Sequence, residues 1–275
     1  MSDKKYPLNI TVACSIGLEG GLARYQNELP SFSHDDFDLI HEWNRNLIKT
    51  VKQPEFKEYL GTTYRVLLNL SPVSVSRIID RLSHVPYRSY YYAKRFIDAA
   101  DFVYDKADMF SNVVDFGRGL SPWGHVVRQK LPTVQMYTFD MSETDAVFQN
   151  VSQKIGLSSP HFNKMPKTID FDKDIFVSLG TFVYLTPQEQ SAKLQFASNQ
   201  FRNLFIELEK PNSVQSDKSL VNNIGTEYNS GLLIPEIQNV MDPTIPVRLK
   251  EIGGTVRDVR VAQSLKNATE MFLVR

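Results

Sequence analysis

The stretch VVDFGRGLSPWG, from Val113 to Gly124, decides the fold class of this chain. An apolar run that ends at a glycine is typical of a buried strand followed by a tight turn. Gly117 and Gly119 allow positive φ angles, and they let a ligand approach the backbone without meeting a Cβ atom. Ser121 suits the N-cap and Pro122 the first position of a following helix. Strand, glycine turn and helix in this order mark the ligand-binding edge of an open α/β sheet, although an ordinary strand-to-helix turn has the same pattern.

Beyond this stretch the pattern alternates between strands and helices. Ser142 is expected to cap a helix that ends near Gly156, and TPQE (Thr186–Glu189) is a capping box with proline at the first helical position. Strands separated by helices of about 10 to 15 residues imply right-handed crossovers and therefore a mostly parallel sheet. The apolar runs that predict strands are residues 134–140, 161–163, 174–180 and 204–209.

The region before the glycine turn has a different hydrophobic pattern. Residues 8–18 are apolar and predict a short strand or a packed arm, whereas residues 33–108 show helical periodicity without intervening strands. These helices are expected to form a cap rather than part of the sheet. The predicted helix starts are Ser33 (with Asp36 completing a capping box), Pro54, Ser71-Pro72 and Ser89.

The C-terminal part differs again. Residues 211–230 are polar and predict a loop, while VRLKEI, the Gly253-Gly254 turn, TVRDVRVAQ and EMFLVR predict antiparallel strands that close one sheet edge. We therefore expect a helical, substrate-covering cap over residues 1–110. An α/β domain with a mostly parallel sheet and an antiparallel C-terminal edge is expected over residues 111–275.

The composition is that of a globular protein, with 42% hydrophobic and 23% charged residues among 275. Thirty-one basic and 31 acidic residues leave no net charge, which gives no support to sequence-independent nucleic-acid binding. One cysteine, Cys14, excludes a disulfide within the chain, and no apolar run is long enough to span a membrane. We expect a cytoplasmic protein without nucleic-acid or membrane partners, and the sequence leaves a homodimer open.

A second acidic residue indicates which kind of ligand the glycine turn binds. Asp140 follows Asp115 by 25 residues and ends the next predicted strand, so it is placed to accept both hydroxyl hydrogens of a ribose. A nicotinamide dinucleotide uses the same geometry, but its fingerprint needs a third glycine where this chain has Pro122. Asp115 would also repel a phosphate, so the pattern favours adenosine that carries cationic groups.

Asp-x-Gly-x-Gly at the end of one strand and an acid at the end of the next resemble the cofactor motifs of class I S-adenosylmethionine-dependent methyltransferases. DIFVSLGTFVYLTPQEQ resembles the segment after the fourth strand of that superfamily, and the likeness covers residues 88–210. The Gly-x-Gly-Leu turn and the helical N-terminal region look like the leucine carboxyl methyltransferase-like branch, as do Arg95 and Asp98, three residues apart before the sheet. Ser121 stands where that branch usually has aspartate. The resemblance implies a Rossmann-like fold and S-adenosyl-L-methionine as cofactor.

The resemblance also implies roles for the residues of the turn and the second strand. The backbone at Gly117 and Gly119 would pass under the methionine part of the cofactor, with Asp115 near its ammonium group. Asp140 would bind the ribose hydroxyls, and Met141 would lie against the adenine. A solvated acid or a helix cap is the plainer interpretation of Asp140.

Three more residues are implied at the edges of the cofactor. Asn163 would bond the adenine edge, although a turn-forming asparagine is the simpler interpretation. Gly180 ends the fourth predicted strand, where its carbonyl would receive the ammonium group. Arg95 would pair with the cofactor carboxylate, or else be a helix-surface arginine paired with Asp98 or Asp101.

The acceptor side of the site is less specific. Tyr184 follows the fourth predicted strand and is the candidate catalytic residue, with a core tyrosine as its alternative. His125 lies near the glycine turn, where a helix-surface histidine is the simpler interpretation. The sequence has no Asn-Pro-Pro-Tyr or Asp-Pro-Pro-Tyr motif after the fourth strand, and no His or Cys cluster with metal-ligand spacing.

Together these patterns predict an S-adenosylmethionine-dependent methyltransferase that acts on an oxygen of a small molecule or a carboxylate. Two alternatives stay open from the sequence. One is a methyltransferase-fold protein that binds without catalysis. The other, which the missing third glycine disfavours, is a nicotinamide-dependent oxidoreductase.

Overall fold

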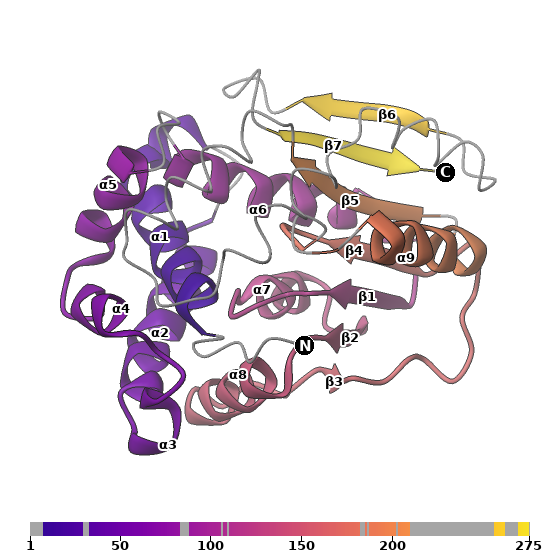
Figure 1. Ribbon diagram of the computed structural model, residues 1–275. Coiled ribbons are helices and arrows are strands. Elements are labelled where there is room, and N and C mark those ends of the chain that lie inside the picture. The colour runs from indigo at the N-terminus through magenta and orange to yellow at the C-terminus, as the bar shows by residue number, and fades with distance from the viewer. Residues whose placement is uncertain are drawn as a thin grey trace.

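The computed structural model describes residues 8–29, 33–82, 88–105, 107–108, 110–181, 185, 187–201, 203–209, 256–261 and 269–274. Figure 1 shows the helices before residue 105 gathered mainly on one side, next to a sheet whose strands run through the rest of the molecule. The predicted loop at 211–230 and the predicted strand VRLKEI lie outside the described residues.

The described strands form one sheet in the order β3-β2-β1-β4-β5-β7-β6. The strands β1 to β5 pair in parallel, and β7 runs antiparallel to both β5 and β6. This order confirms the expected Rossmann-like α/β fold. The strand bounds are β1 (Asn112–Phe116), β2 (Gln135–Phe139), β3 (His161–Phe162), β4 (Ile175–Ser178), β5 (Asn203–Glu209), β6 (Val256–Val261) and β7 (Thr269–Val274).

The register of the parallel strands brings their carboxyl ends to one edge. Asp115 on β1 pairs with Thr138 on β2, and Phe116 pairs with Phe139. The N–H of Gly117, just past β1, donates a 2.7 Å hydrogen bond to the carbonyl of Phe139. The glycine turn and the end of β2 are therefore held side by side, as expected for neighbouring parallel strands.

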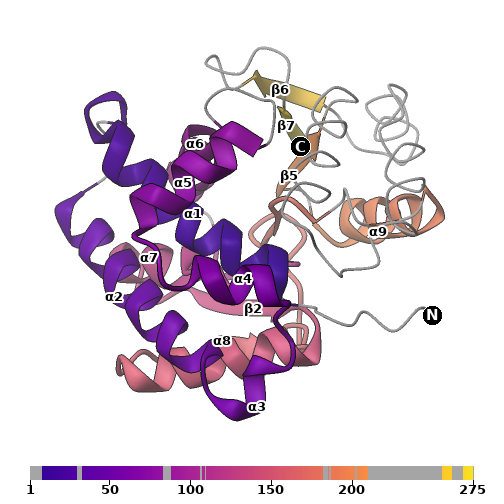
Figure 2. The same cartoon turned by 60° about the vertical axis from the view of Figure 1, so that its left-hand side comes forward.

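Helices precede the sheet and alternate with its parallel strands. Figure 2, turned by 60°, brings α1 to α5 forward and leaves α9 on the far side of the sheet from them. The helix bounds are α1 (Asn9–Tyr25), α2 (His34–Val51), α3 (Pro54–Lys57), α4 (Thr62–Leu67), α5 (Pro72–Leu82), α6 (Arg88–Tyr104), α7 (Trp123–Lys130), α8 (Ser142–Lys154) and α9 (Pro187–Gln200), with a 3-10 turn at Gln26–Glu28.

The two faces of the sheet pack against different helices because side chains alternate along each strand. Val113 of β1 packs into a core with apolar residues of α6 and α7, including Phe96 and Val126. The next residue, Val114, points to the opposite face and packs with Phe201, which follows α9. The sheet is thus buried on both sides, as parallel sheets require.

A further apolar core joins the N-terminal helices to α8. It contains Trp43 and Leu47 of α2 together with Val147 and Phe148 of α8, and it includes Leu120 of the glycine turn. The turn is therefore covered by helices from the beginning of the chain, not by solvent alone.

The prediction of a strand or arm at residues 8–18 was wrong, because this segment lies in α1. Apolar runs that are buried on several sides do not reveal by periodicity whether they are strand or helix. The glycines of α1 favour the helical packing: a Cβ on Gly20 would collide with the backbone of Pro72, and one on Gly21 with that of Ser89. These contacts let α5 and α6 approach α1 closely.

Other helix boundaries also differ from the sequence expectation. The helix expected from Pro54 is divided into α3 and α4, with Gly61 as the N-cap of α4. Pro122 rather than Ser121 is the N-cap of α7, and Met141 rather than Ser142 is that of α8. The predicted capping box of Ser33 and Asp36 is confirmed, with both hydrogen bonds present.

None of the helices in the described part of the chain has the length and apolar character that crossing a lipid bilayer requires.

Candidate functional site

The ends of β1 and β2 form the centre of the candidate site. The N–H of Gly119 donates a 2.7 Å hydrogen bond to Oδ2 of Asp140, and the N–H of Met141 donates a 2.8 Å bond to Oδ1. Each carboxylate oxygen thus has one protein donor and keeps a further lone pair. Asp140 is half-buried and binds the glycine turn, so it is neither a fully solvated acid nor the N-cap residue of α8.

Gly117 and Gly119 both adopt left-handed backbone angles, with φ of 72° and 60°. A Cβ atom on Gly117 would collide with the side chain of Thr181, and one on Gly119 would lie 3.2 Å from Cγ2 of Thr11. Close protein packing thus excludes a Cβ at Gly117, a reason that the sequence did not reveal, whereas at Gly119 the positive φ is the stronger requirement. Contact of their peptide groups with a methionine moiety stays a prediction.

Asp115 is almost completely buried, with 2% of its surface exposed. Its Oδ1 has no hydrogen-bond partner among the described residues. Burial raises the pKa of Asp115 to about 7, the charge of Arg118 acts in the opposite direction, and Asp140 raises the pKa further. A buried carboxylate oxygen without a donor is costly unless a ligand or a water molecule supplies one.

Arg118, between the two glycines, is a buried residue that the sequence interpretation missed. Its Nη2 binds Oδ1 of Asp145, and its Nη1 donates a 3.0 Å bond to the carbonyl of Gly119. The guanidinium carbon lies 3.7 Å from the ring centre of Phe148, in cation–π geometry. A long cationic side chain between turn glycines, next to strand-end acids, is the signal that points to an internal counter-ion.

Asn163 lies at the end of β3 and connects β2 to α8. Its φ is 46°, its N–H donates to the carbonyl of Thr138 at 2.7 Å, and its Nδ2 donates to Oδ2 of Asp145 at 2.6 Å. Its Oδ1 accepts a 3.3 Å bond from the N–H of Asp140. These contacts are those of a turn-forming asparagine, and the adenine contact stays a prediction.

Arg95 and Gly180 lie close together at the other side of the turn. Gly180 follows β4 with a φ of 69°, and Nη1 of Arg95 lies 2.8 Å from the place where a Cβ atom on Gly180 would be. The guanidinium of Arg95 also stacks over the ring of Tyr92, 4.8 Å from its centre. Asp98, one of the two acids considered as partners of Arg95, binds Lys94. The structure thus places Arg95 of α6 at the carboxyl end of β4.

The remaining predicted residues divide into three cases. Met141 is half-buried at the start of α8, next to Asp140, so its place fits the expected contact with a base. Tyr184, the predicted catalytic residue, lies outside the described residues. The simpler interpretation of His125, as a surface residue, was wrong.

His125 is 4% exposed, and its ring contacts side chains of both α2 and α8, with its centre 5.3 Å from that of Trp43. Its ring stacks on Phe148 at 5.1 Å, and its Nε2 lies 2.9 Å from Oγ of Ser152. That hydroxyl donates to the carbonyl of Phe148, so the imidazole is the donor toward Ser152. Burial lowers the pKa of His125 to about 3, which keeps the ring neutral.

The charges of the site exclude some ligands and favour others. Asp115, Asp140 and Asp145 gather around one buried cation, Arg118, and all three raise its pKa against the effect of burial. An anionic pyrophosphate next to these carboxylates would be repelled. A ligand with hydroxyl donors and a positive group suits the same set of acceptors.

No protein-family model and no curated protein matches this sequence. Solved structures match at low identity. A SAM-dependent methyltransferase from Aquifex aeolicus is 16% identical, with a TM-score of 0.44 over 64% of this chain and 88% of that chain. The magnesium protoporphyrin IX methyltransferase ChlM from Synechocystis PCC 6803, solved with bound SAM, is 10% identical, with a TM-score of 0.46 over 89% and 98%. The mitomycin 7-O-methyltransferase MmcR is 12% identical, with a TM-score of 0.44 over 85% and 68%.

Proposed function

We propose that this chain is an S-adenosyl-L-methionine-dependent methyltransferase that methylates an oxygen of a small molecule. One observation carries the proposal: the ends of β1 and β2 present Asp115 and Asp140 around a glycine turn that is bonded to Asp140. The acids therefore belong to one site, as a single nucleoside ligand with positive charge requires.

The residues of the site fit the groups of this cofactor. Asp140 keeps a lone pair on each oxygen, so it can accept both ribose hydroxyls without losing its bonds to the turn. Asp115 is 2% exposed behind the turn, and its negative charge favours an ammonium group at this edge of the sheet. Arg95, against Gly180, supplies a guanidinium fork for the carboxylate.

When bound, S-adenosylmethionine supplies a methyl group on a sulfonium, which is already electrophilic. The protein then has to hold the acceptor oxygen in line with the methyl group and to exclude water. An ionised carboxylate needs no base, whereas a hydroxyl acceptor needs one. We propose Tyr184 for the acceptor side because it follows β4 by a few residues, and we propose the N-terminal helices as the cover of the acceptor.

The same residues disfavour a nicotinamide dinucleotide. Pro122 occupies the position of the third glycine of the dinucleotide fingerprint and is the N-cap of α7, and the next glycine, Gly124, comes two residues too late for that spacing. The three carboxylates around Arg118 add repulsion toward phosphate. Both features support a cofactor without phosphate groups.

Isothermal titration calorimetry with S-adenosylhomocysteine tests the proposal, with NAD⁺ and NADP⁺ titrated in parallel. We expect heat with S-adenosylhomocysteine and none with the dinucleotides. Absence of heat and of a thermal shift with millimolar S-adenosylhomocysteine would overturn the proposal. A following screen with tritiated methyl donor against carboxylic acids, phenols and amines identifies the acceptor class.

The same screen separates catalysis from mere binding. Methyl transfer to an acid or phenol, lost in Asp140→Asn, supports the enzyme. Tight binding of S-adenosylhomocysteine without transfer to any member of the library would instead support a protein that uses this fold only to bind.

A further inference from the structure

Beneath the glycine turn, Arg118 is the centre of a bonded chain that returns to the strand ends. Its Nη2 binds Oδ1 of Asp145, and Oδ2 of Asp145 accepts from Nδ2 of Asn163 at 2.6 Å. Oδ1 of Asn163 then accepts from the N–H of Asp140 at 3.3 Å. Arg118 is thus connected to the backbone of Asp140 through two side chains.

A second connection runs through the turn itself. Nη1 of Arg118 donates to the carbonyl of Gly119 at 3.0 Å, and the N–H of the same glycine donates to Oδ2 of Asp140 at 2.7 Å. The side chain of Arg118 is 2% exposed, so both connections begin at a buried cation, while the bond between Asn163 and Asp140 lies at the exposed end of the first one. Arg118 therefore fixes Asp140 from its backbone side and from its carboxylate side.

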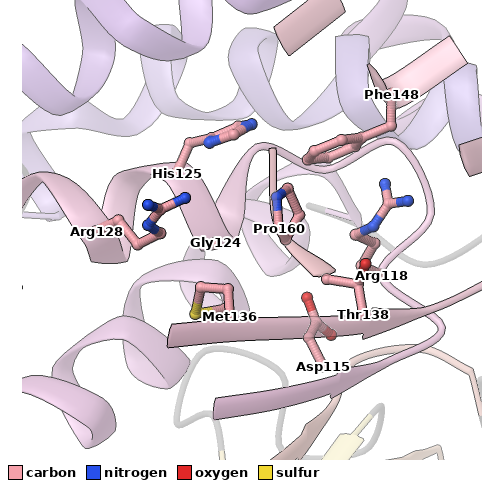
Figure 3. Close-up of a pocket in the computed structure, with 9 residues that line it drawn as sticks. All are labelled: Asp115, Arg118, Gly124, His125, Arg128, Met136, Thr138, Phe148 and Pro160. Atoms are coloured by element: carbon pink, nitrogen blue, oxygen red, sulfur yellow. The ribbon is translucent and has the colours of Figure 1, made fainter. Parts of the chain in front are cut away.

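A small cavity joins Arg118 to Asp115. Figure 3 shows Asp115, Thr138 and Arg118 turned toward a common space that His125, Arg128 and Phe148 help to line. Oδ1 of Asp115, Oγ1 of Thr138 and Nε of Arg118 all lack a hydrogen-bond partner among the described residues. The cavity offers about 10 Å³ to the centre of a water molecule, which is about the space that one water needs.

The groups that face Asp115 come from each neighbouring element. Thr138 is its register partner on β2, and Val177 is its partner on β4. The helix α7 brings neutral His125, and Arg128, whose Nη1 donates to the carbonyl of Ser158. The positive charge of Arg118 lowers the pKa of Asp115, and the negative charge of Asp140 raises it.

We propose that Arg118 is a positioning residue for the cofactor site, which it serves by fixing Asp140 and by reaching Asp115 through a water molecule bound among Asp115, Arg118 and Thr138. The water has an acceptor in Asp115, a donor in Arg118 Nε and a hydroxyl that serves as either, so it satisfies three orphaned groups. Arg118 and this water favour the ionised form of Asp115, which is the form that an ammonium group needs. The inference rests on the proposed function only in that last step.

The titration of Asp115 in the free protein tests the first part without any ligand. The carboxyl ¹³C resonance of Asp115, assigned with Asp115→Asn, is followed from pH 5 to 9. Arg118→Met removes the counter-ion and is expected to raise the midpoint by about one pH unit. Thr138→Val removes only the hydroxyl and is expected to raise the midpoint by less, in the same direction.

Thr144→Val is the matched control for the hydroxyl. Oγ1 of Thr144 is also buried and has no hydrogen-bond partner within the described part of the chain, but the residue does not line this cavity. The midpoint of Asp115 should not move in this variant. If Arg118→Met does not fold, Thr138→Val carries the test, because it keeps both the volume and the charge of the site.

Affinity for S-adenosylhomocysteine against pH tests the second part. Arg118→Met should weaken binding about tenfold at pH 8.5, because Asp140 loses its support, and the fall in affinity toward low pH should begin at higher pH than in the wild type. A midpoint of Asp115 that stays at the wild-type value in both Arg118→Met and Thr138→Val would overturn the inference. If instead the midpoints move as expected but S-adenosylhomocysteine does not bind, the link from Arg118 through the water to Asp115 is confirmed and the proposed function is wrong.

Discussion

The N–H of Gly119 and Oδ2 of Asp140 are joined by a 2.7 Å hydrogen bond that crosses from the end of β1 to the end of β2. This bond fixes a carboxylate at the edge of the sheet while leaving lone pairs on both of its oxygens for a ligand. A turn that is bonded to its own ligand-binding acid is already organised before binding, which reduces the entropy that the ligand must overcome.

Asp140→Asn is expected to weaken the binding of S-adenosylhomocysteine and of 5′-methylthioadenosine about tenfold to a hundredfold, because both ligands carry the ribose diol and lose charge-assisted bonds. Calorimetric titration measures both affinities. The control is Asp38→Asn on α2, whose side chain is 65% exposed, and it should bind as the wild type does. Equal affinities in wild type and Asp140→Asn would separate Asp140 from ribose recognition.

Arg95→Met is expected to weaken S-adenosylhomocysteine about tenfold and to leave 5′-methylthioadenosine unchanged, because only the first ligand has a carboxylate. The two titrations, run on one preparation, cancel general effects on folding. Arg45→Met on α2, 59% exposed, is the control for loss of an arginine. Equal losses for both ligands would show that Arg95 supports the structure and does not recognise the carboxylate.

Asp115 is expected to make the free protein less stable as pH rises. Its pKa is raised from 3.8 to about 7 by burial, so the folded state holds a proton that the unfolded state has lost between about pH 4 and pH 7. The stabilising contribution is therefore present at low pH and is lost as the pH rises through 7. Urea unfolding of the wild type and of Asp115→Asn at pH 5.5 and pH 8 measures the effect.

The expected result is that Asp115→Asn gains stability relative to the wild type on going from pH 5.5 to pH 8, while it binds S-adenosylhomocysteine more weakly at pH 8. This result would show that ionised Asp115 destabilises the free protein at pH 8 but contributes to ligand binding. A free-energy difference between variant and wild type that is the same at both pH values would argue that Asp115 does not titrate in this range.

Gly117→Ala is expected to destabilise the fold by about 3 kcal/mol, because it combines a left-handed backbone angle with a collision against Thr181. Gly156→Ala is the matched comparison. Gly156 has a φ of 70°, but a Cβ there would meet nothing within 4 Å, so its cost should be about 1 kcal/mol. Chemical denaturation measures both, and similar costs would show that Thr181 moves aside freely.

The central sheet was predictable because its strands carry local signals. The apolar runs before Gly117 and Gly180 contain β1 and β4, and Asp115 of β1 pairs with Thr138, two residues before Asp140, as parallel pairing of the two strands demands. The position of Gly156 just after the C-cap of α8 was also predictable, because a positive φ after a helix favours glycine.

The parts that could not be predicted depend on contacts between distant segments. Residues 8–18 are apolar on several sides because α1 is packed against α5 and α6, and such a run has no period that identifies a helix. His125 is buried because Trp43 of α2 and Phe148 of α8 pack against its ring. In the sequence Arg118 looks like an ordinary residue of a glycine turn. Its role depends on Asp145 and Asn163, which come from later elements.

The covering of the turn by the N-terminal helices is a similar case. Nε1 of Trp43 donates a 2.9 Å bond to the carbonyl of Leu120, and Oγ of Ser15 donates to the same oxygen at 3.1 Å. Helical periodicity identified α2 as amphipathic, but it gave no indication that Trp43 would be bonded to the glycine turn.

A crystal structure of the complex with S-adenosylhomocysteine tests the central claim most directly. The account predicts ribose hydroxyls bonded to both oxygens of Asp140, with the amino group of the ligand next to Asp115. Ligand density elsewhere on the molecule, or a nucleoside bound at this edge with its ribose away from Asp140, would contradict it.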